Sequence, residues 1–321
     1  MTNKFSQYIT KHEVVAPKSN ATICSFCHFD AREKIAPYVV HYLKELKEAG
    51  CDTYFVSNNE YIAEEYLAEI RPYVTDIVLR VNEGYDFAAY FTGYYLAKDK
   101  GYERLIFAND SAYGPFYALA ETFEHMAGFD MWGISDAYAG RYHIQSYFWM
   151  FNLTPRMKEF MDRKLNDFVF TSVKEMVVNM YEEGISQAIL EEGFNVGVLC
   201  MNERAEEIER NSNDPELKSI KAGVASVANL KVKPWLRMLA IVNPKRRAKN
   251  ANKINMHTYG TGIFSCWYTL VKYMDCPFIK VGMVKKHSME KFHDFKYPQV
   301  IGAKYPAYDL NLIENHRKGL Y

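Results

Sequence analysis

The sequence has 321 residues, of which 49% are hydrophobic and 24% are charged. A chain of this length and composition buries at least one large core, which excludes an intrinsically disordered protein. Its 39 Lys and Arg residues balance its 39 Asp and Glu residues, so no overall positive field favours nucleic acid as a partner.

The sequence also limits where the protein is expected to act. Residues 1–17 are polar and lack the cationic start and apolar stretch of a secretory signal, and no window holds the roughly 18 apolar residues that span a bilayer. We therefore expect a cytoplasmic protein that at most lies peripherally on the inner face of the cytoplasmic membrane. Cys24, Cys27 and His28 match a haem-attachment pattern. Because residues three apart on a strand point to opposite faces, we interpret both cysteines as core residues.

The first two-thirds of the chain alternates short apolar runs with amphipathic runs. This pattern is typical of an α/β fold with a mainly parallel, Rossmann-like sheet flanked by helices. In chain order, the expected elements are a strand at 21–29, a helix at 35–50, a strand at 53–57, a helix at 61–70, a strand at 76–81, a helix at 87–98, a strand at 104–108, a helix at 117–126, strands at 131–134 and 143–151, and helices at 156–165 and 185–192.

The pattern changes beyond residue 202, which divides the chain into three expected parts. These are a main domain over 1–202, a charged and amphipathic basic extension over 203–255, and a C-terminal segment over 256–321 that packs on the main domain. In the extension, an apolar stretch from Trp235 precedes a basic run that ends at Lys253. This stretch predicts either contact with an anionic membrane surface or a helix on the core with a solvated basic tail.

Polar side chains follow each of the first four expected parallel strands. In an open α/β sheet, ligands bind at the carboxyl ends of the strands, so these side chains are the candidate binding residues. Neither the glycine-rich dinucleotide fingerprint nor the Walker phosphate loop is present, which disfavours a dinucleotide or ATP enzyme. The candidates are His28 and Asp30 after the first strand, Asn58 after the second, Asn82, Gly84 and Asp86 after the third, and Asn109, Asp110 and Ser111 after the fourth.

The stretch from Arg80 to Ser111 resembles the nucleotide-sugar-binding half of the glycosyltransferase A fold. In that fold, Asn-x-Gly opens a helix, and an apolar strand ends at an acidic motif that holds the donor diphosphate through a divalent metal. The resemblance implies Mn²⁺ or Mg²⁺, because a hard cation neutralises the charge of the leaving phosphates. Ala108 replaces the first carboxylate of the usual Asp-x-Asp, so Asp110 is the sole acidic metal ligand, and metal use stays open. A turn that caps the next helix is the alternative role of 109–111.

Three motifs in order resemble the rhamnan synthesis protein F family. They are the Asn-x-Gly-x-Asp stretch at 82–86, Asn-Asp-Ser-x-x-Gly-Pro at 109–115 and His-x-Gln-Ser-Tyr-Phe at 143–148, and the resemblance covers roughly 23–202. It implies a glycosyltransferase of bacterial cell-surface polysaccharide assembly that moves L-rhamnose from dTDP-L-rhamnose to a lipid-linked glycan. The alternatives are transfer of another activated group, such as glycerol phosphate, and a non-catalytic role in a glycan-assembly complex, which Ala108 suggests.

Two further groups of residues are candidates for the site. His143 and Gln145 alternate on one expected strand and so share a face, where they line the donor or acceptor pocket or serve the structure. An inverting transferase needs a carboxylate that deprotonates the acceptor hydroxyl. Glu183 is the first candidate for this general base and Asp136 the second. The alternative is that these acids only stabilise helix starts.

Overall fold

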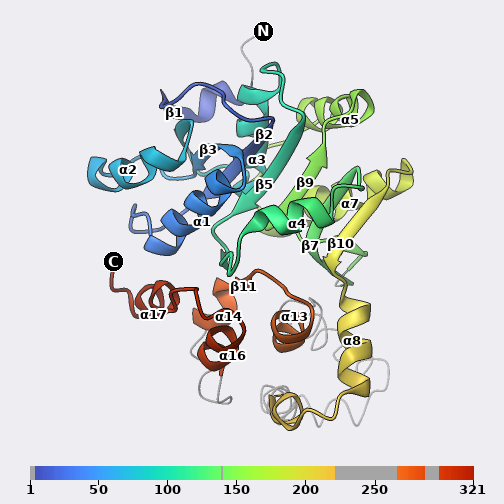
Figure 1. Cartoon of the computed structure of the whole chain (residues 1–321). Coiled ribbons are helices and arrows are strands. Elements are labelled where there is room, and N and C mark those ends of the chain that lie inside the picture. The colour runs from blue at the N-terminus through green and yellow to red at the C-terminus, as the bar shows by residue number, and fades with distance from the viewer. Residues whose placement is uncertain (1–3, 139, 221–265, 286–295) are drawn as a thin grey trace, which may run out of the picture.

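The computed structural model describes residues 4–138, 140–220, 266–285 and 296–321 (Figure 1). The stretch Trp235–Lys253, for which the sequence predicts a membrane-surface contact, lies outside the described residues. None of the helices that the structure describes is long and apolar enough to cross a membrane.

The centre of the molecule is one mixed sheet, which contains nine strands among the described residues. Four neighbouring strands are parallel, as are β7 and β10, while β1, β8 and β9 pair antiparallel with their neighbours. The expected mixed α/β fold, with a mainly parallel sheet flanked by helices, is thus confirmed. Across the sheet, the strands are β1 (Ile9–Val14), β4 (Asp76–Arg80), β3 (Cys51–Ser57), β2 (Thr22–His28), β5 (Arg104–Asn109), β9 (Phe148–Asn152), β7 (Met131–Ala137) and β10 (Val196–Cys200), with β8 (His143–Ile144) beside β7.

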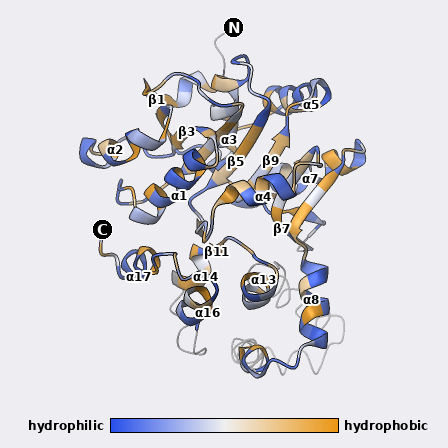
Figure 2. Cartoon of the chain, in the orientation of Figure 1, coloured by the Kyte–Doolittle hydropathy of each residue, from blue (hydrophilic) through white to orange (hydrophobic). Residues whose placement is uncertain are grey.

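Helices cover both faces of this sheet and enclose two hydrophobic cores. Hydrophilic and hydrophobic residues alternate along outer helices such as α1 and α8 (Figure 2), as expected for helices that pack one side on a core. One face carries α3 (Tyr85–Ala97), α5 (Pro155–Asn166), α6 (Lys174–Val177), the π-helical segment η3 (Val178–Glu183) and α7 (Gly184–Glu191). The other face carries α1 (Pro37–Glu48), α2 (Glu64–Ile70), α4 (Leu119–His125) and α8 (Asn202–Asn211).

The central strand β2 shows why the parallel strands form continuous apolar runs. All seven of its residues are buried, because helices cover both faces of the sheet. Cys24 belongs to the core on the α1 side and Cys27 to the core on the α3 side. The interpretation of these two residues as core cysteines on opposite faces of a strand is therefore confirmed.

The C-terminal residues return to the sheet and complete the core on the α1 side. Phe278 packs against Tyr42 of α1 and Phe148 of β9. The two-residue strand β11 pairs antiparallel with β6, which follows β5, so Lys280 lies opposite Ala112. The remaining elements are β6 (Ala112–Tyr113), α13 (Trp267–Tyr273), β11 (Ile279–Lys280), α14 (Val281–Lys285), α16 (Tyr297–Lys304) and α17 (Asn311–Lys318).

The single strand expected over 143–151 is wrong. The chain forms β8 at the end of β7, turns, and re-enters the sheet as β9 between β5 and β7. Because a turn separates the two strands, the alternation of side chains does not continue from His143 to Phe151. The edge strand β1 and the strand β10 were not expected either.

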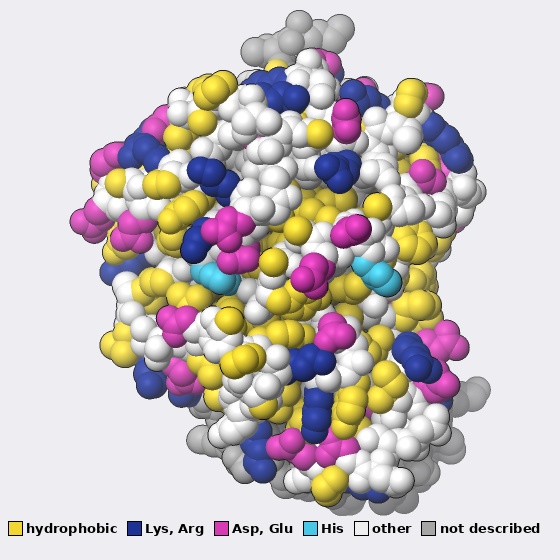
Figure 3. All heavy atoms as spheres, viewed as in Figure 1, with side chains coloured by type: hydrophobic (Ala, Val, Ile, Leu, Met, Phe, Trp, Pro, Cys, Tyr) yellow, Lys and Arg dark blue, Asp and Glu magenta, His cyan; other side chains and the backbone are white. Residues whose placement is uncertain are grey.

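The surface carries no broad field of one charge on the face shown in Figure 3. Acidic and basic side chains are interspersed there, over an apolar background. This distribution agrees with the balanced charge of the sequence. Any electrostatic recognition on this face therefore depends on local groups.

Candidate functional site

Polar groups meet where the parallel strands end. In the register of the sheet, Cys27 lies opposite Asn109, and His28 lies opposite Ser57. The carboxylate of Asp110 accepts a hydrogen bond from the backbone N–H of Phe29, with 2.9 Å between the heavy atoms. Asp110 therefore joins the loops that follow β2 and β5. The two loops lie at the same edge of the sheet because β2 and β5 run parallel, and ligands bind at this edge in open α/β sheets.

Asp86 reaches the same edge because α3 lies unusually close to β2. A Cβ atom on Gly93 would lie 2.0 Å from Ser25 Oγ, so only glycine permits this approach. Gly84, with φ of 85°, begins the helix. Asp86 follows in the first turn, where the helix dipole stabilises a negative charge. One of its oxygens accepts a hydrogen bond from Asn109 Nδ2 at 2.8 Å.

Sequence reasoning missed a cation in this cluster, Lys280. Its Nζ donates a hydrogen bond to Ser111 Oγ at 2.8 Å and lies 4.2 Å from the centre of the Tyr147 ring. Ser111 in turn donates to Asn109 Oδ1, which continues a hydrogen-bonded chain to Asp86. Lys280 and Ser111 are 169 residues apart, and no local sequence signal links them. Only the pairing of β11 with β6 brings them together.

Burial shifts the pKa values of the three charged groups in this cluster toward their neutral forms. It raises the pKa of Asp110 to about 7; the hydrogen bond from Phe29 opposes this shift, and the charges of Asp86 and Asp30 add to it. Burial also raises the pKa of Asp86, and Lys280 opposes that shift. The pKa of Lys280 is lowered to about 8 by burial, against the pull of nearby carboxylates. The groups are thus electrostatically coupled.

A cavity of about 230 Å³ opens beside this cluster. Its walls come from the loop after β2, from α1, from the loop after β5 and from the start of α14. Four of the predicted binding residues line it, and the C-terminal residues supply part of the wall. The lining includes His28, Asp30, Tyr38, Asp110, Ser111, Val281, Gly282 and His316.

Several of the predicted binding residues at the strand ends have partners within the protein. His28 is buried and hydrogen-bonds Ser57 Oγ at 2.9 Å, and burial lowers its pKa to about 4, so it is neutral at pH 7. Asp30 accepts a hydrogen bond from the Tyr321 hydroxyl at 2.8 Å. Asn58 is buried and accepts a hydrogen bond from Arg80, whereas Asn82 is exposed in the turn before α3.

His143 and Gln145 do not share a strand face, since Gln145 lies in the turn after β8. His143 Nδ1 bonds the backbone oxygen of Arg141 at 2.8 Å. Gln145 Oε1 accepts a hydrogen bond from Ser135 Oγ at 2.9 Å. Both side chains are buried, and these contacts tie the turn to β7 and to the loop before β8.

The two candidate bases are both buried, Asp136 in β7 and Glu183 in η3. Glu183 accepts a hydrogen bond from Arg141 Nε at 3.2 Å. Asp136 accepts one from the backbone N–H of Asn202 at 2.7 Å, and burial raises its pKa. The neighbouring Glu182 instead accepts hydrogen bonds from the Ser146 N–H and hydroxyl at 2.8 and 2.9 Å. The negative charge of Glu182 contributes an upward shift to the pKa of both Asp86 and Lys280.

The described residues do not fit a protein-built metal centre. Within the ranges that the structure describes, no three His, Cys, Asp or Glu side chains are arranged to hold one metal ion. Ala108 supplies no ligand, and Asp110 and Asp86 each already accept a hydrogen bond from the protein. The role of Asp110 as a metal ligand therefore stays a prediction, and any metal ion there would need ligands from the donor or from water.

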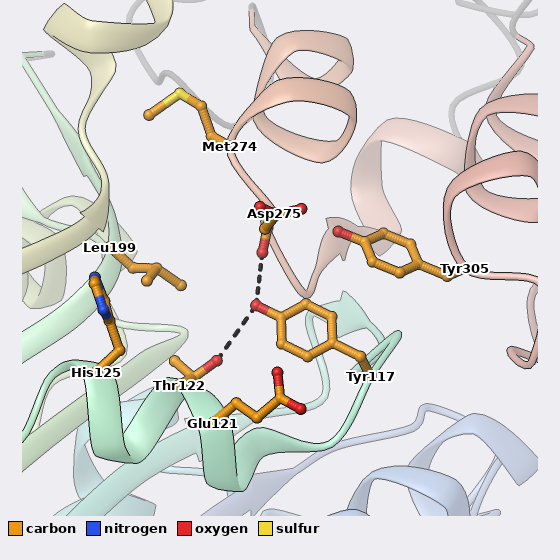
Figure 4. Close-up of a pocket in the computed structure, with 8 residues that line it drawn as sticks. All are labelled: Tyr117, Glu121, Thr122, His125, Leu199, Met274, Asp275 and Tyr305. Carbon is orange, nitrogen blue, oxygen red and sulfur yellow. Dashed lines mark hydrogen bonds between the residues drawn. The ribbon is translucent and has the colours of Figure 1, made fainter.

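A second and larger cavity, of about 440 Å³, lies between α4 and the C-terminal residues (Figure 4). The Tyr117 hydroxyl donates to the backbone oxygen of Asp275 at 2.6 Å and accepts from Thr122 at 3.3 Å. The Tyr117 and Tyr305 rings stack with centres 5.5 Å apart. Glu121 and Asp275 also line this cavity, and both are exposed.

Comparison with known proteins gives partial matches. Two curated relatives, both named virulence protein VirA and both from Vibrio anguillarum, are 34% identical over 129 residues. The match spans 37% of this chain and 40% of the length of these relatives.

Two solved structures align at low identity. The glycosyltransferase GlyE of Streptococcus pneumoniae TIGR4 is 14% identical, with a TM-score of 0.35 over 60% of this chain and 47% of that one. A protein described as a nucleotide-diphospho-sugar transferase from Desulfovibrio desulfuricans G20 is 12% identical, with a TM-score of 0.34 over 56% of this chain and 80% of that one.

The family comparison covers more of the chain. The sequence model described as rhamnan synthesis protein F matches residues 53–238, which is more than half of the chain. The match includes the three motifs at 82–86, 109–115 and 143–148 that suggested this family. The chain belongs to the rhamnan synthesis protein F family.

Proposed function

We propose that this protein is a glycosyltransferase that moves a sugar from a nucleotide-sugar donor to a growing bacterial surface polysaccharide. One observation carries the proposal: Asp110, Asp86 and Lys280 converge beside a cavity at the carboxyl ends of β2 and β5. That edge is where open α/β sheets bind ligands. Membership of the rhamnan synthesis protein F family supports sugar transfer over other uses of such an edge.

The acceptor hydroxyl requires a general base if the reaction inverts the anomeric carbon. Glu183 and Asp136 are the candidates from the sequence. Glu182 is a third, because its carboxylate acts electrostatically on Asp86 and Lys280, whereas Glu183 bonds Arg141. We propose that the base is one of these three carboxylates. Glu182 is the first choice, because its charge acts on Asp86 and Lys280, the residues placed at the donor diphosphate.

The finer identity of the substrates rests on the family alone. We propose dTDP-L-rhamnose as the donor and a lipid-linked glycan as the acceptor. An acceptor of this kind would bring the protein to the inner face of the cytoplasmic membrane. The sequence Trp235–Lys253 supplies an apolar stretch and cations for an anionic surface. Flotation with anionic vesicles tests this part: binding at low salt that is lost at high salt supports it, and no binding at low salt contradicts it.

The test of the proposed function is a transfer assay with the full chain. A panel of nucleotide-sugars is incubated with lipid-linked glycan acceptors, and the products are separated and their anomeric configuration determined. Transfer from a nucleotide-sugar, with an inverted anomeric carbon, is the expected result. Transfer only from an activated glycerol phosphate donor would favour that alternative. The absence of donor binding and transfer in every combination would favour a non-catalytic role.

A further inference from the structure

The cation Lys280 lies among carboxylates without being paired to any of them. Among the residues that the structure describes, no carboxylate oxygen lies within 4.0 Å of its Nζ, although the charges of Glu182, Asp86 and Asp110 all act on it. An ammonium group has three N–H donors, and the hydrogen bond to Ser111 uses one of them. The amine therefore keeps donors and charge for a ligand.

The position of Lys280 is fixed by backbone pairing and by side-chain contacts. β11 pairs with β6, and the backbone N–H of Val281 donates to the Ser111 oxygen at 2.9 Å. The Tyr147 ring lies 4.2 Å from the amine and is itself buried. A lysine on a flexible stem is held in one place only by such contacts. Ser111 and Val281 both line the 230 Å³ cavity, so the amine bonds one of its wall residues and belongs to the residue that precedes another.

A donor diphosphate placed there needs a positive partner. Within the described ranges, no three His, Cys, Asp or Glu side chains are arranged to hold one metal ion, and Ala108 occupies the position of the missing carboxylate. An oriented ammonium group stabilises phosphate charge through charge-assisted hydrogen bonds, whereas a metal ion does so by coordination. Two other cations near the strand ends already have partners: Arg32 pairs with Asp30, and Arg80 donates hydrogen bonds to Asn58 and to the backbone oxygen of Glu83. The pairing of β11 with β6 brings Lys280 to Ser111, beside the ends of β2 and β5.

We propose that Lys280 binds the donor diphosphate and stabilises it as a leaving group, in the role that a divalent metal has in glycosyltransferases with two acidic ligands. The proposal rests on the proposed function. In the transfer step, the bond from the anomeric carbon to the phosphate oxygen breaks, and its electron pair stays on the diphosphate. The Lys280 ammonium donates a hydrogen bond to that diphosphate. The acceptor oxygen bonds the anomeric carbon, and its proton passes to a carboxylate base.

The test measures nucleotide binding by the full chain in the presence of EDTA. Calorimetry with dTDP and UDP is compared with calorimetry with thymidine and uridine, for the wild type and for Lys280→Met. We expect the wild type to bind a nucleoside diphosphate without metal. Loss of a charge-assisted hydrogen bond should raise the dissociation constant of the diphosphate about 10- to 100-fold. The affinity for the nucleoside should not change, because the nucleoside carries no phosphate.

Two control variants separate phosphate binding from folding. Lys280→Arg keeps the charge and should restore most of the diphosphate affinity. Lys304→Met removes a cation from the same C-terminal residues, where Lys304 pairs with Asp275 at 2.6 Å, and should leave binding unchanged. Equal losses of nucleoside and diphosphate affinity in Lys280→Met, without rescue by arginine, would mean that Lys280 only holds the fold, which overturns the proposal.

Diphosphate binding with and without manganese distinguishes an error about Lys280 from an error about the proposed function. If the wild type binds diphosphates only with manganese, and Lys280→Met binds them equally well, then Lys280 has no phosphate role but the donor site stands. If the wild type binds no nucleoside diphosphate with or without manganese, both proposals are wrong. Transfer that persists in EDTA and falls in Lys280→Met would support both.

Discussion

The cavity at the strand ends and the larger cavity beside α4 differ in a way that their volumes do not capture. The larger one, between α4 and the C-terminal residues, is lined by two exposed carboxylates. The hydroxyl of Tyr117 in its wall is hydrogen-bonded to Asp275 and Thr122, which also line this cavity. The smaller one lies beside a cluster in which Asp110, Asp86 and Lys280 are half-buried and electrostatically coupled. Coupled, half-buried charges at strand ends mark a functional site better than volume does.

Substitutions at the two cavities should differ most in their effect on sugar transfer. Asp110→Asn should abolish transfer, because the amide removes the negative charge at the strand end while keeping the hydrogen bond from Phe29. Asp275→Asn, at the larger cavity, is the matched control and should transfer at nearly the wild-type rate. The assay follows product formation from the donor at fixed acceptor concentration. Wild-type turnover by Asp110→Asn would refute the assignment of the smaller cavity.

The general base provides the next largest effect. Glu182→Gln should lower the rate of transfer about 100- to 10,000-fold while dTDP binding persists, since the amide keeps the shape and loses the basicity. Glu183→Gln and Asp136→Asn test the two carboxylates chosen from the sequence. If one of those variants is inactive and Glu182→Gln is active, the base moves to that residue. A product that retains the donor's anomeric configuration would contradict a single-base mechanism.

The pH dependence of nucleotide binding should distinguish the amine from the carboxylates. The lowered pKa of Lys280, about 8, means that its charge is present below pH 8 and is lost as the pH rises through that value. The affinity for dTDP in EDTA should therefore fall about tenfold between pH 7 and pH 9. Lys280→Arg should remove most of this dependence, because arginine stays charged. A flat profile in the wild type would be inconsistent with binding through Lys280.

The smallest expected effect is on stability. Asp110→Asn should stabilise the folded protein although it abolishes transfer. The pKa of Asp110 is raised to about 7, so its burial favours folding at low pH and opposes folding as the pH rises through 7. Asp110→Asn should thus raise the unfolding midpoint at pH 8, by about 2–4 °C for each kcal/mol relieved. At pH 4 the gain should shrink. A lower midpoint at pH 8 would show that the carboxylate stabilises the site.

The sequence predicts the parts of this fold that local patterns encode. The buried strands β2, β3 and β5 and the polar residues after them follow from apolar runs and from the rule that ligands bind at strand ends. β1 was missed because it is an edge strand with charged residues, Lys11, His12 and Glu13, rather than an apolar run. The split between β8 and β9 was missed because the residues that connect them, Gln145, Ser146 and Tyr147, are buried and include no Gly or Pro that would indicate a turn.

The site could be predicted only where its residues lie close to strand ends. Asp110 and Asp86 carry local motifs, whereas Lys280 reaches them through a two-residue strand pairing that has no periodicity to detect. The general base shows a second limit. Glu182 and Glu183 both belong to the π-helical segment η3, and a helical wheel drawn for an α-helix does not describe side-chain directions in such a segment. Glu183 as the base therefore stays a prediction beside Glu182.

The most direct test of the account is a crystal structure of the full chain with a bound nucleotide-sugar. The account predicts that the diphosphate lies at the strand ends, within hydrogen-bond distance of Lys280 Nζ and beside Asp110. A diphosphate bound instead in the larger cavity between α4 and the C-terminal residues, with the strand ends empty, would contradict it.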